Sequence, residues 1–270
     1  NARSLDKLRI YFSSLTGTIP AEFWKLKNLT QGRLFGNFLT GSLPSAGSWG
    51  GMIAASQSSS LFNLKKLWAL DLRENSLTGP IPRELLELPA LKQLNLNSNS
   101  LTGSIPAGRA GSLAELDLSS NSLSGAIPPQ LAHLSSLQAL DLYKNSLAGV
   151  IPPELGQLQN LTKLDLSNNA LTGTIPSNFS ALSKLEEFLV QGNNLQSSTT
   201  EAGSFEFIDP LVQRNLKVVD VSHNSFTGTV PDTVFALPSL QVLLVGSNCF
   251  SGTLPSNICS AMNLVTLELA

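Results

Sequence analysis

One phrase of about 24 residues recurs along the chain and constrains its fold more than any other feature. Each copy is centred on an asparagine, with apolar residues at positions −3, −5, −8 and −11 before it. In one copy these residues are Leu72, Leu70, Leu67 and Leu64, before Asn75. The anchors are Asn37, Asn75, Asn99, Asn121, Asn145, Asn169, Asn193, Asn224 and Asn248, and Ser13 takes the same role in the first copy. No single copy can bury its own leucines, so the copies must stack to form one continuous core.

The apolar positions also predict the local structure of each copy. Residues at −5 and −3 point inward while those at −6, −4 and −2 point outward, which is the alternation of a β-strand. Each copy therefore contributes one short parallel strand, and an eleventh copy begins with Leu264, Leu267 and Leu269. Strands at a spacing of about 4.8 Å would then form a sheet roughly 50 Å long. We expect residues 1–270 to form a single solenoid of about eleven repeats.

The anchor asparagines are expected to be structural rather than functional. An amide side chain has donors and an acceptor, so it can satisfy backbone groups that are left bare where a strand turns. Stacked on one another, the anchors predict a buried ladder of amides along the solenoid.

A second motif follows the anchor in nine of the ten anchored copies, as in LTGTIP, LTGSIP and LSGAIP. This tail resembles the plant-specific class of leucine-rich repeats. That class occurs in receptor-like kinase ectodomains, receptor-like proteins and polygalacturonase-inhibiting proteins. The resemblance implies an α/β-type solenoid, a right-handed superhelix with one long parallel concave β-sheet, a second short sheet, and irregular or 3-10 convex segments. It also implies an extracellular or cell-surface location.

Two insertions interrupt the period. The first, residues 45–60, is rich in glycine, serine and alanine and contains Trp49 and Met52. The second, residues 196–215, lacks the glycine and proline of the tail, and its Phe205, Phe207 and Ile208 could fold back onto the solenoid. Either insertion could carry ligand contacts or be a harmless elaboration, because loops tolerate added length cheaply. Since the last residues stop in the middle of a repeat, we expect a fragment of a longer chain.

The outward strand positions are the candidates for ligand or partner binding, because they are the part of each repeat that is free to vary. The first repeats place aromatic and arginine side chains there, which are typical of binding hot spots. These residues are Arg9, Tyr11, Arg33, Phe35, Trp68 and Arg73. The alternative is that they contact an N-terminal cap.

The middle and late repeats differ from the first ones in character. Asp117, Asp141 and Asp165 are expected to lie about 5 Å apart in consecutive strands. Their like charges repel one another, so a cationic partner would stabilise this row. Lys144 and Lys163 could neutralise this row locally. The other candidates are Tyr143 in the middle and Leu189 and Leu244 in the late repeats. The late apolar residues form either a partner patch or a surface covered by further repeats.

Composition excludes several classes of function. The formal net charge is −2, which argues against nucleic acid as the main partner because phosphate binding needs a basic face. No apolar run is long enough to span a membrane. His133 and His223 are nearly four repeats apart, and no cysteine and histidine cluster has metal-binding spacing. We therefore expect no enzymatic activity, no metal and no cofactor.

Modification sites offer weaker signals. Asn28, Asn160 and Asn178 begin acceptor sequences for N-glycosylation, and all three spare the concave face. Cys249 and Cys259 lie ten residues apart, so they are either bridged or partly buried free thiols.

The leading interpretation is an extracellular recognition scaffold that binds a peptide, protein or glycan on its concave and lateral faces. A rigid array suits this function because its binding surface is ordered before the ligand arrives. The alternatives are an inhibitor of cell-wall hydrolases and a surface or wall protein that self-assembles through its open ends. Ice binding is a further alternative, because Thr-Gly-Thr recurs from Thr16, Thr172 and Thr227, although Pro80 and Val150 interrupt the array.

Overall fold

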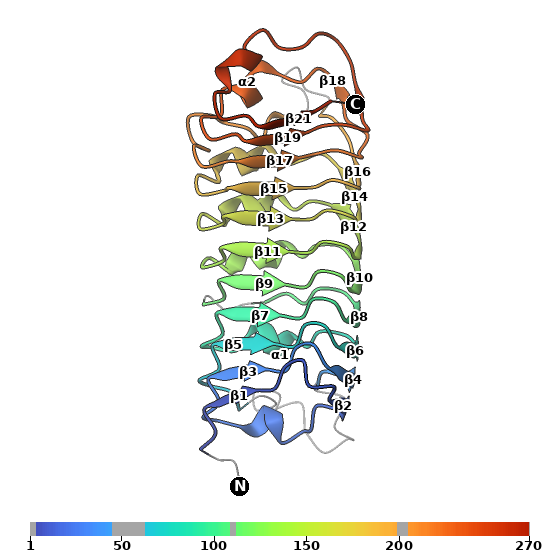
Figure 1. Cartoon of the computed structure of the whole chain (residues 1–270), viewed down its shortest axis with the longest axis vertical. Coiled ribbons are helices and arrows are strands. Elements are labelled where there is room, and N and C mark those ends of the chain that lie inside the picture. Colours follow the sequence, from blue (N-terminus) through green and yellow to red (C-terminus); the bar gives the residue numbers. More distant parts are fainter. Residues whose placement is uncertain (1–3, 45–62, 109–111, 199–204, 270) are drawn as a thin grey trace.

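The structure is a computed structural model that describes residues 4–44, 63–108, 112–198 and 205–269. Its principal feature is a parallel sheet of eleven strands that follow one another in chain order (Figure 1). The strands are β1 (Lys7–Arg9), β3 (Gln31–Arg33), β5 (Ala69–Asp71), β7 (Gln93–Asn95), β9 (Glu115–Asp117), β11 (Ala139–Asp141), β13 (Lys163–Asp165), β15 (Glu187–Leu189), β17 (Val218–Asp220), β19 (Val242–Leu244) and β21 (Thr266–Glu268). The predicted solenoid with one strand per repeat is confirmed.

The tail motifs that follow the anchors, such as LTGTIP, form a second parallel sheet of eight strands. Its strands are β2 (Thr16–Thr18), β4 (Phe38–Ser42), β6 (Ser76–Gly79), β8 (Ser100–Gly103), β10 (Ser122–Gly125), β12 (Ser146–Val150), β14 (Ala170–Gly173) and β16 (Asn194–Leu195). A bridge from Gln196 to Ser225 and a separate pair, β18 (Thr227–Gly228) and β20 (Cys249–Phe250), extend the same side of the molecule. The glycine of each tail has a positive φ, such as +78° at Gly173, which an L side chain rarely adopts.

Short helical turns close the convex side, as the family resemblance implies. They are η1 (Phe23–Lys25), α1 (Arg83–Leu86), η3 (Pro129–His133), η4 (Pro153–Gln157), η5 (Ser177–Ala181), α2 (Asp232–Phe235) and η7 (Ile258–Ser260). Proline stands at the N-cap of α1, η3, η4, η5 and α2, where its extended backbone ends the tail. Within the described ranges, no helix is long and apolar enough to cross a membrane.

The leucines of the repeat form the core. The four that precede Asn75 are at most 1% exposed, and the same positions are buried in the interior coils. At the two ends they are only partly buried, as at Leu8 and Leu267. The anchor amides link the coils. The Asn169 Nδ2 group donates to the carbonyls of Leu142, Leu166 and Ser167 at 3.0 to 3.1 Å, and its Oδ1 accepts the Leu147 N–H at 3.0 Å.

The amide ladder that the sequence predicts is therefore confirmed. Every anchor from Asn37 to Asn248 donates to three carbonyls and accepts at least one backbone N–H of the preceding coil. The residue before each anchor has a positive φ, for example 54° at Lys144 and 52° at Asn168. This turn aims the anchor amide back into the stack.

Residues 205–215 of the second insertion pack onto the solenoid, as their aromatic side chains predict. Phe205 and Phe207 are 3% and 2% exposed, and the ring centroid of Phe207 lies 5.0 Å from that of Phe188 in β15. Gln213 is fully buried and donates to the Phe179 carbonyl at 3.0 Å. These residues thus contribute buried side chains to the core. The first insertion, residues 45–60, lies outside the described residues.

Candidate ligand-binding face

The outward side chains of the eleven-stranded sheet line up in rows because adjacent strands pair in register. One row at position −4 runs from Arg9 and Arg33 through the acidic middle to Leu189 and Leu244. Its members are Arg9, Arg33, Asp71, Asn95, Asp117, Asp141, Asp165, Leu189, Asp220, Leu244 and Glu268. The structure therefore brings the predicted candidates onto one face, which we call the concave face.

An aromatic cluster occupies the N-terminal part of this face. The rings of Tyr11 and Phe35 stack with centroids 4.9 Å apart, and Phe12 meets Phe35 edge-on at 5.2 Å. The guanidinium carbon of Arg73 lies 4.4 Å from the Phe35 ring centroid on this face. Phe35 is only 9% exposed because its neighbours cover it, and its contact with a ligand stays a prediction. Tyr11 and Phe12 are the exposed members, at 47% and 69%.

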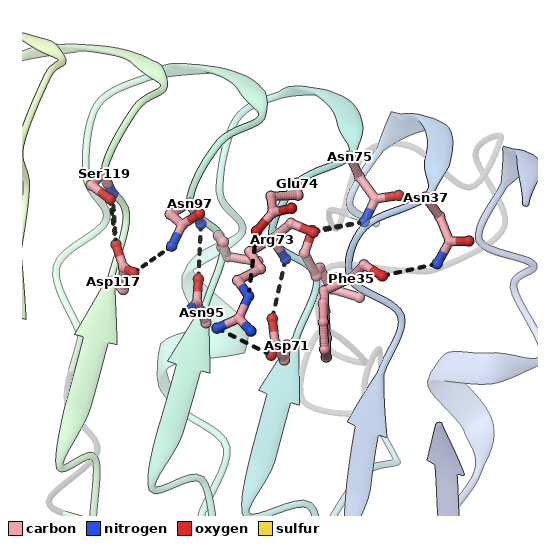
Figure 2. A network of polar contacts seen from close by, with 12 residues as sticks. Phe35, Asn37, Asp71, Arg73, Glu74, Asn75, Asn95, Asn97, Asp117 and Ser119 are labelled. Carbon is pink, nitrogen blue, oxygen red and sulfur yellow. Dashed lines mark hydrogen bonds and ion pairs between the residues drawn. The ribbon is translucent and has the colours of Figure 1, made fainter. Parts of the chain in front are cut away.

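Arg73 is held in place by its surroundings. Its Nη1 lies 3.8 Å from Asp71 Oδ2 and its Nε lies 3.8 Å from Glu74 Oε1 (Figure 2). The Nε atom is buried and has no hydrogen-bond partner among the described residues. Burial raises the pKa of Asp71, although Arg73, a backbone hydrogen bond and Arg33 oppose this effect. Arg73 thus presents a half-exposed guanidinium in a fixed position.

The aspartates in the middle repeats of the −4 row have a structural role in addition to their charge. Asp117, Asp141 and Asp165 each accept the backbone N–H two residues later, at 3.0 to 3.1 Å, where the strand ends. Asp117 also accepts a hydrogen bond from Asn97 Nδ2 at 2.6 Å (Figure 2). Such local bonds terminate the strand in the manner of an Asx turn.

Asp165 is less exposed than Asp117 and Asp141, and its contact with a partner stays a prediction. It is only 7% exposed, and the Ser167 hydroxyl and N–H both bond its Oδ1. Burial raises its pKa most, the Asp141 charge adds to this rise, and the Ser167 hydrogen bonds oppose it. Asp117 and Asp141 remain half-buried and are reachable from the concave side.

Lys163 neutralises part of the acidic row, as its position in the sequence suggests. Its Nζ lies 2.8 Å from Asp141 Oδ2. Burial alone would lower the pKa of Lys163, but the hydrogen bond to Asp141 and the charges of Asp141, Asp165 and Glu187 raise it on balance. Glu115 is exposed on the neighbouring −6 row. Sequence reasoning missed Glu115, although its position −6 in the strand could have identified it.

The remaining candidates on this face are more weakly organised. Trp68 is half-exposed just before β5, and Tyr143 is 36% exposed after β11. Leu189 and Leu244 are half-exposed, but Asp220 lies between them in the row and is 7% exposed. The late apolar column is therefore interrupted by a buried carboxylate.

The predicted modification sites lie elsewhere. Asn178 is exposed in η5, whereas Asn160 is half-buried, donating to the Ser135 carbonyl and accepting from Lys184 Nζ. Asn28 is also half-buried and accepts from Lys66 Nζ. Glycosylation at these positions remains a prediction.

The two cysteines do not form a disulfide, which was one of the two alternatives that the sequence left open. Cys249 and Cys259 are free and exposed, because one lies in β20 and the other in the convex turn η7. Neither is the partly buried thiol that was the other expectation. Among the described residues, no group of histidine, cysteine, aspartate or glutamate could hold a metal ion.

Comparison with known proteins places this geometry in a family. Seven segments, which together make up more than half of the chain, match the leucine-rich repeat family: residues 66–88, 90–108, 112–134, 136–158, 160–182, 215–237 and 239–261. A search of curated protein sequences found no match.

Solved structures of plant receptors share the fold. The structure of PEPR1 with AtPEP1 is 30% identical over 99% of this chain, with a TM-score of 0.82. The ectodomain of the Arabidopsis thaliana membrane receptor kinase GASSHO1/SCHENGEN3, in complex with CASPARIAN STRIP INTEGRITY FACTOR 2, is 31% identical over all of this chain, with a TM-score of 0.79. The chain spans only 38% and 33% of those two chains.

A plant ice-binding protein is also similar, with 29% identity and a TM-score of 0.59. That match covers 86% of this chain and 78% of the ice-binding protein. The period, the two sheets, the amide ladder and these matches agree: the chain belongs to the leucine-rich repeat family, and its repeats are of the plant type seen in receptor-kinase ectodomains.

Proposed function

We propose that the chain is an extracellular recognition module that binds an extended peptide or protein segment along its concave face. The observation that carries this proposal is the row of fixed, outward-facing side chains in the N-terminal half. Phe35, Asp71 and Glu74 hold Arg73, and backbone N–H groups hold Asp117 and Asp141. Side chains that are ordered before binding lose little entropy when a ligand arrives, which favours affinity.

The similar structures support the same reading. One is the structure of PEPR1–AtPEP1, one is a plant membrane receptor kinase in complex with CASPARIAN STRIP INTEGRITY FACTOR 2, and another is described as a plant peptide hormone receptor in complex with RGF2. A long parallel sheet suits an extended ligand because each strand offers a similar set of outward positions. Aromatic residues and arginine at the centre of such a surface dominate binding energies.

Substitution of exposed concave aromatics tests the proposal. We expect peptides selected from a random displayed library against the purified chain to bind Trp68→Ala and Tyr143→Ala at least about tenfold more weakly, because these aromatic anchors would lose their buried area. The matched control is His133→Ala, whose exposed side chain lies on the convex turn η3. The measurement is the dissociation constant by fluorescence anisotropy. Unchanged affinity in the Trp68→Ala and Tyr143→Ala double variant would contradict the concave-face site.

Ice binding is a second candidate function, favoured by the ice-binding relative and by the second sheet. The tail strands expose mostly small uncharged side chains on a parallel sheet, and the aromatic Phe38, 60% exposed, interrupts them beside Thr16. From β2 to β14 the exposed residues include Thr16, Thr18, Thr40, Ser42, Thr78, Pro80, Thr102, Ser104, Ser124, Ala126, Ala148, Val150, Thr172 and Thr174. A flat array of methyl and hydroxyl groups at about 4.8 Å intervals could order water in a lattice.

Ice recrystallisation distinguishes this candidate from peptide recognition. If the second sheet binds ice, the wild-type chain should slow the growth of ice crystals, and Thr102→Lys should abolish the effect because a long charged side chain lifts the sheet from the surface. Trp68→Ala, on the other sheet, should leave the effect unchanged. Crystal growth equal to that in a non-binding protein at the same concentration would exclude ice binding.

A further inference from the structure

Charge is distributed unevenly along the chain, although its net value is small. Residues 1–92 carry eleven lysines and arginines and six aspartates and glutamates, whereas residues 93–270 carry six and thirteen. Because a solenoid keeps sequence order in space, this asymmetry becomes a separation of charge along the long axis (Figure 1). The first third is therefore electropositive and the remainder electronegative.

The positive pole reaches the concave face on β1 and β3. Arg9 and Arg33 are register partners on adjacent strands, and Lys7 lies beside Arg9 on the same outward side. Within the described residues, none of these three forms an ion pair, and the Arg9 side chain is held by a hydrogen bond to Gln31. Like charges on adjacent strands repel, so an anion between Arg9 and Arg33 would offset this repulsion. Asp71, the register partner of Arg33 on its other side, offsets only the Arg33 charge.

The negative pole lies on β9. Glu115 is exposed and Asp117 is half-buried, and both accept hydrogen bonds only from uncharged donors among the described residues. Between the poles, Arg73 lies beside Asp71 after β5, and β7 itself has no charged side chain. The exposed Lys92 stands just before β7, and its carbonyl accepts the Glu115 N–H. Beyond β9, Lys163 offsets Asp141. The two unpaired poles are thus β1 with β3, and β9.

The distance between the poles sets the length of a matching ligand. Three to four strand steps separate β9 from β3 and β1, which at about 4.8 Å each is roughly 14 to 19 Å. An extended peptide rises about 3.3 Å per residue. A peptide lying along the sheet axis would therefore span the poles with about four to six residues.

Resting on the proposed function, we propose that the preferred ligand is a dipolar extended peptide. Its carboxylate lies between Arg9 and Arg33, and a lysine or arginine about four to six residues away lies against Glu115 and Asp117. Tyr11 flanks the first contact and can receive an apolar neighbour of the carboxylate. The carboxylate comes from an aspartate or glutamate side chain or from the peptide C terminus.

The test is a selection of random twelve-residue peptides on the intact chain, followed by sequencing. We expect enriched peptides to pair an acidic with a basic group at that spacing, in either order, and to bind about tenfold more weakly at high salt. Peptides selected on the Arg9→Gln, Arg33→Gln double variant should no longer be enriched in acidic groups but should still be enriched in basic groups. Peptides selected on Glu115→Gln should keep the enrichment in acidic groups and lose the enrichment in basic groups. Amidating the C terminus of synthesised hits separates the two sources of the carboxylate.

The outcomes separate this inference from the proposed function. Peptides that lose affinity in Trp68→Ala and Tyr143→Ala but show no charge spacing would overturn the dipolar ligand and leave concave-face recognition standing. The absence of any peptide sensitive to those two substitutions would overturn both. Because the charge spacing is read from the wild-type selection, the conclusion does not depend on the folding of a variant.

Discussion

Replacing Asn169 by alanine is expected to lower the free energy of unfolding by about 3 kcal/mol. The substitution removes donors to the Leu142, Leu166 and Ser167 carbonyls and the acceptor of the Leu147 N–H, all between two packed coils. Removing one partner leaves a buried backbone group unsatisfied, which costs about 1–3 kcal/mol each, partly offset by water that reaches the gap. The measurement is the urea midpoint followed by circular dichroism.

The control is Asn194→Ala, an exposed asparagine in β16 of the second sheet. We expect it to change stability by less than about 0.5 kcal/mol, because exposed substitutions rarely do more. Hydrogen exchange should locate the Asn169→Ala effect in β11 and β13, since contacts in a repeat array are made with neighbours. Equal midpoints for the two variants would show that the ladder does not couple the coils.

The sequence predicts the repeat, the strand of each repeat and the amide ladder because these depend on residue type at a fixed spacing. Leu70 and Leu72 must be inward, and only an amide at Asn75 can serve donors and an acceptor together. The left-handed residue before each anchor could not be predicted. Lys144 and His223 adopt positive φ without the usual glycine, because the strained turn is imposed by the stack rather than by local preference.

The candidate site could be predicted only as a face. Position −4 correctly places Arg9, Asp117 and Asp141 outward. The covering of Phe35 by Tyr11 and Phe12 depends on contacts between neighbouring coils. Asp165 is held by hydrogen bonds from Ser167 in its own turn. Period and alternation specify the direction of a side chain, whereas exposure depends on the sizes of the residues in the adjacent repeats.

Replacing Phe207 by alanine is expected to destabilise the C-terminal half of the solenoid by about 3–4 kcal/mol. Phe207 is 2% exposed and its ring contacts those of Phe188 in β15 and Phe205 in the insertion, with centroids 5.0 and 5.6 Å away. Its loss would leave a cavity between the insertion and the sheet. Because the insertion replaces a normal convex turn, its release would also expose the core on that side. The measurements are the urea midpoint and the rate of limited proteolysis after residue 205.

Leu211→Ala is the matched control, because Leu211 belongs to the same insertion but is 78% exposed. Its midpoint should differ from that of the wild type by less than about 0.5 kcal/mol, and its proteolysis rate should be unchanged. If Phe207→Ala behaved like Leu211→Ala, the insertion would be a detachable loop. A large effect of Phe207→Ala alone would instead make the insertion a structural coil, so that the concave face beyond β15 owes its rigidity to residues outside the repeat pattern.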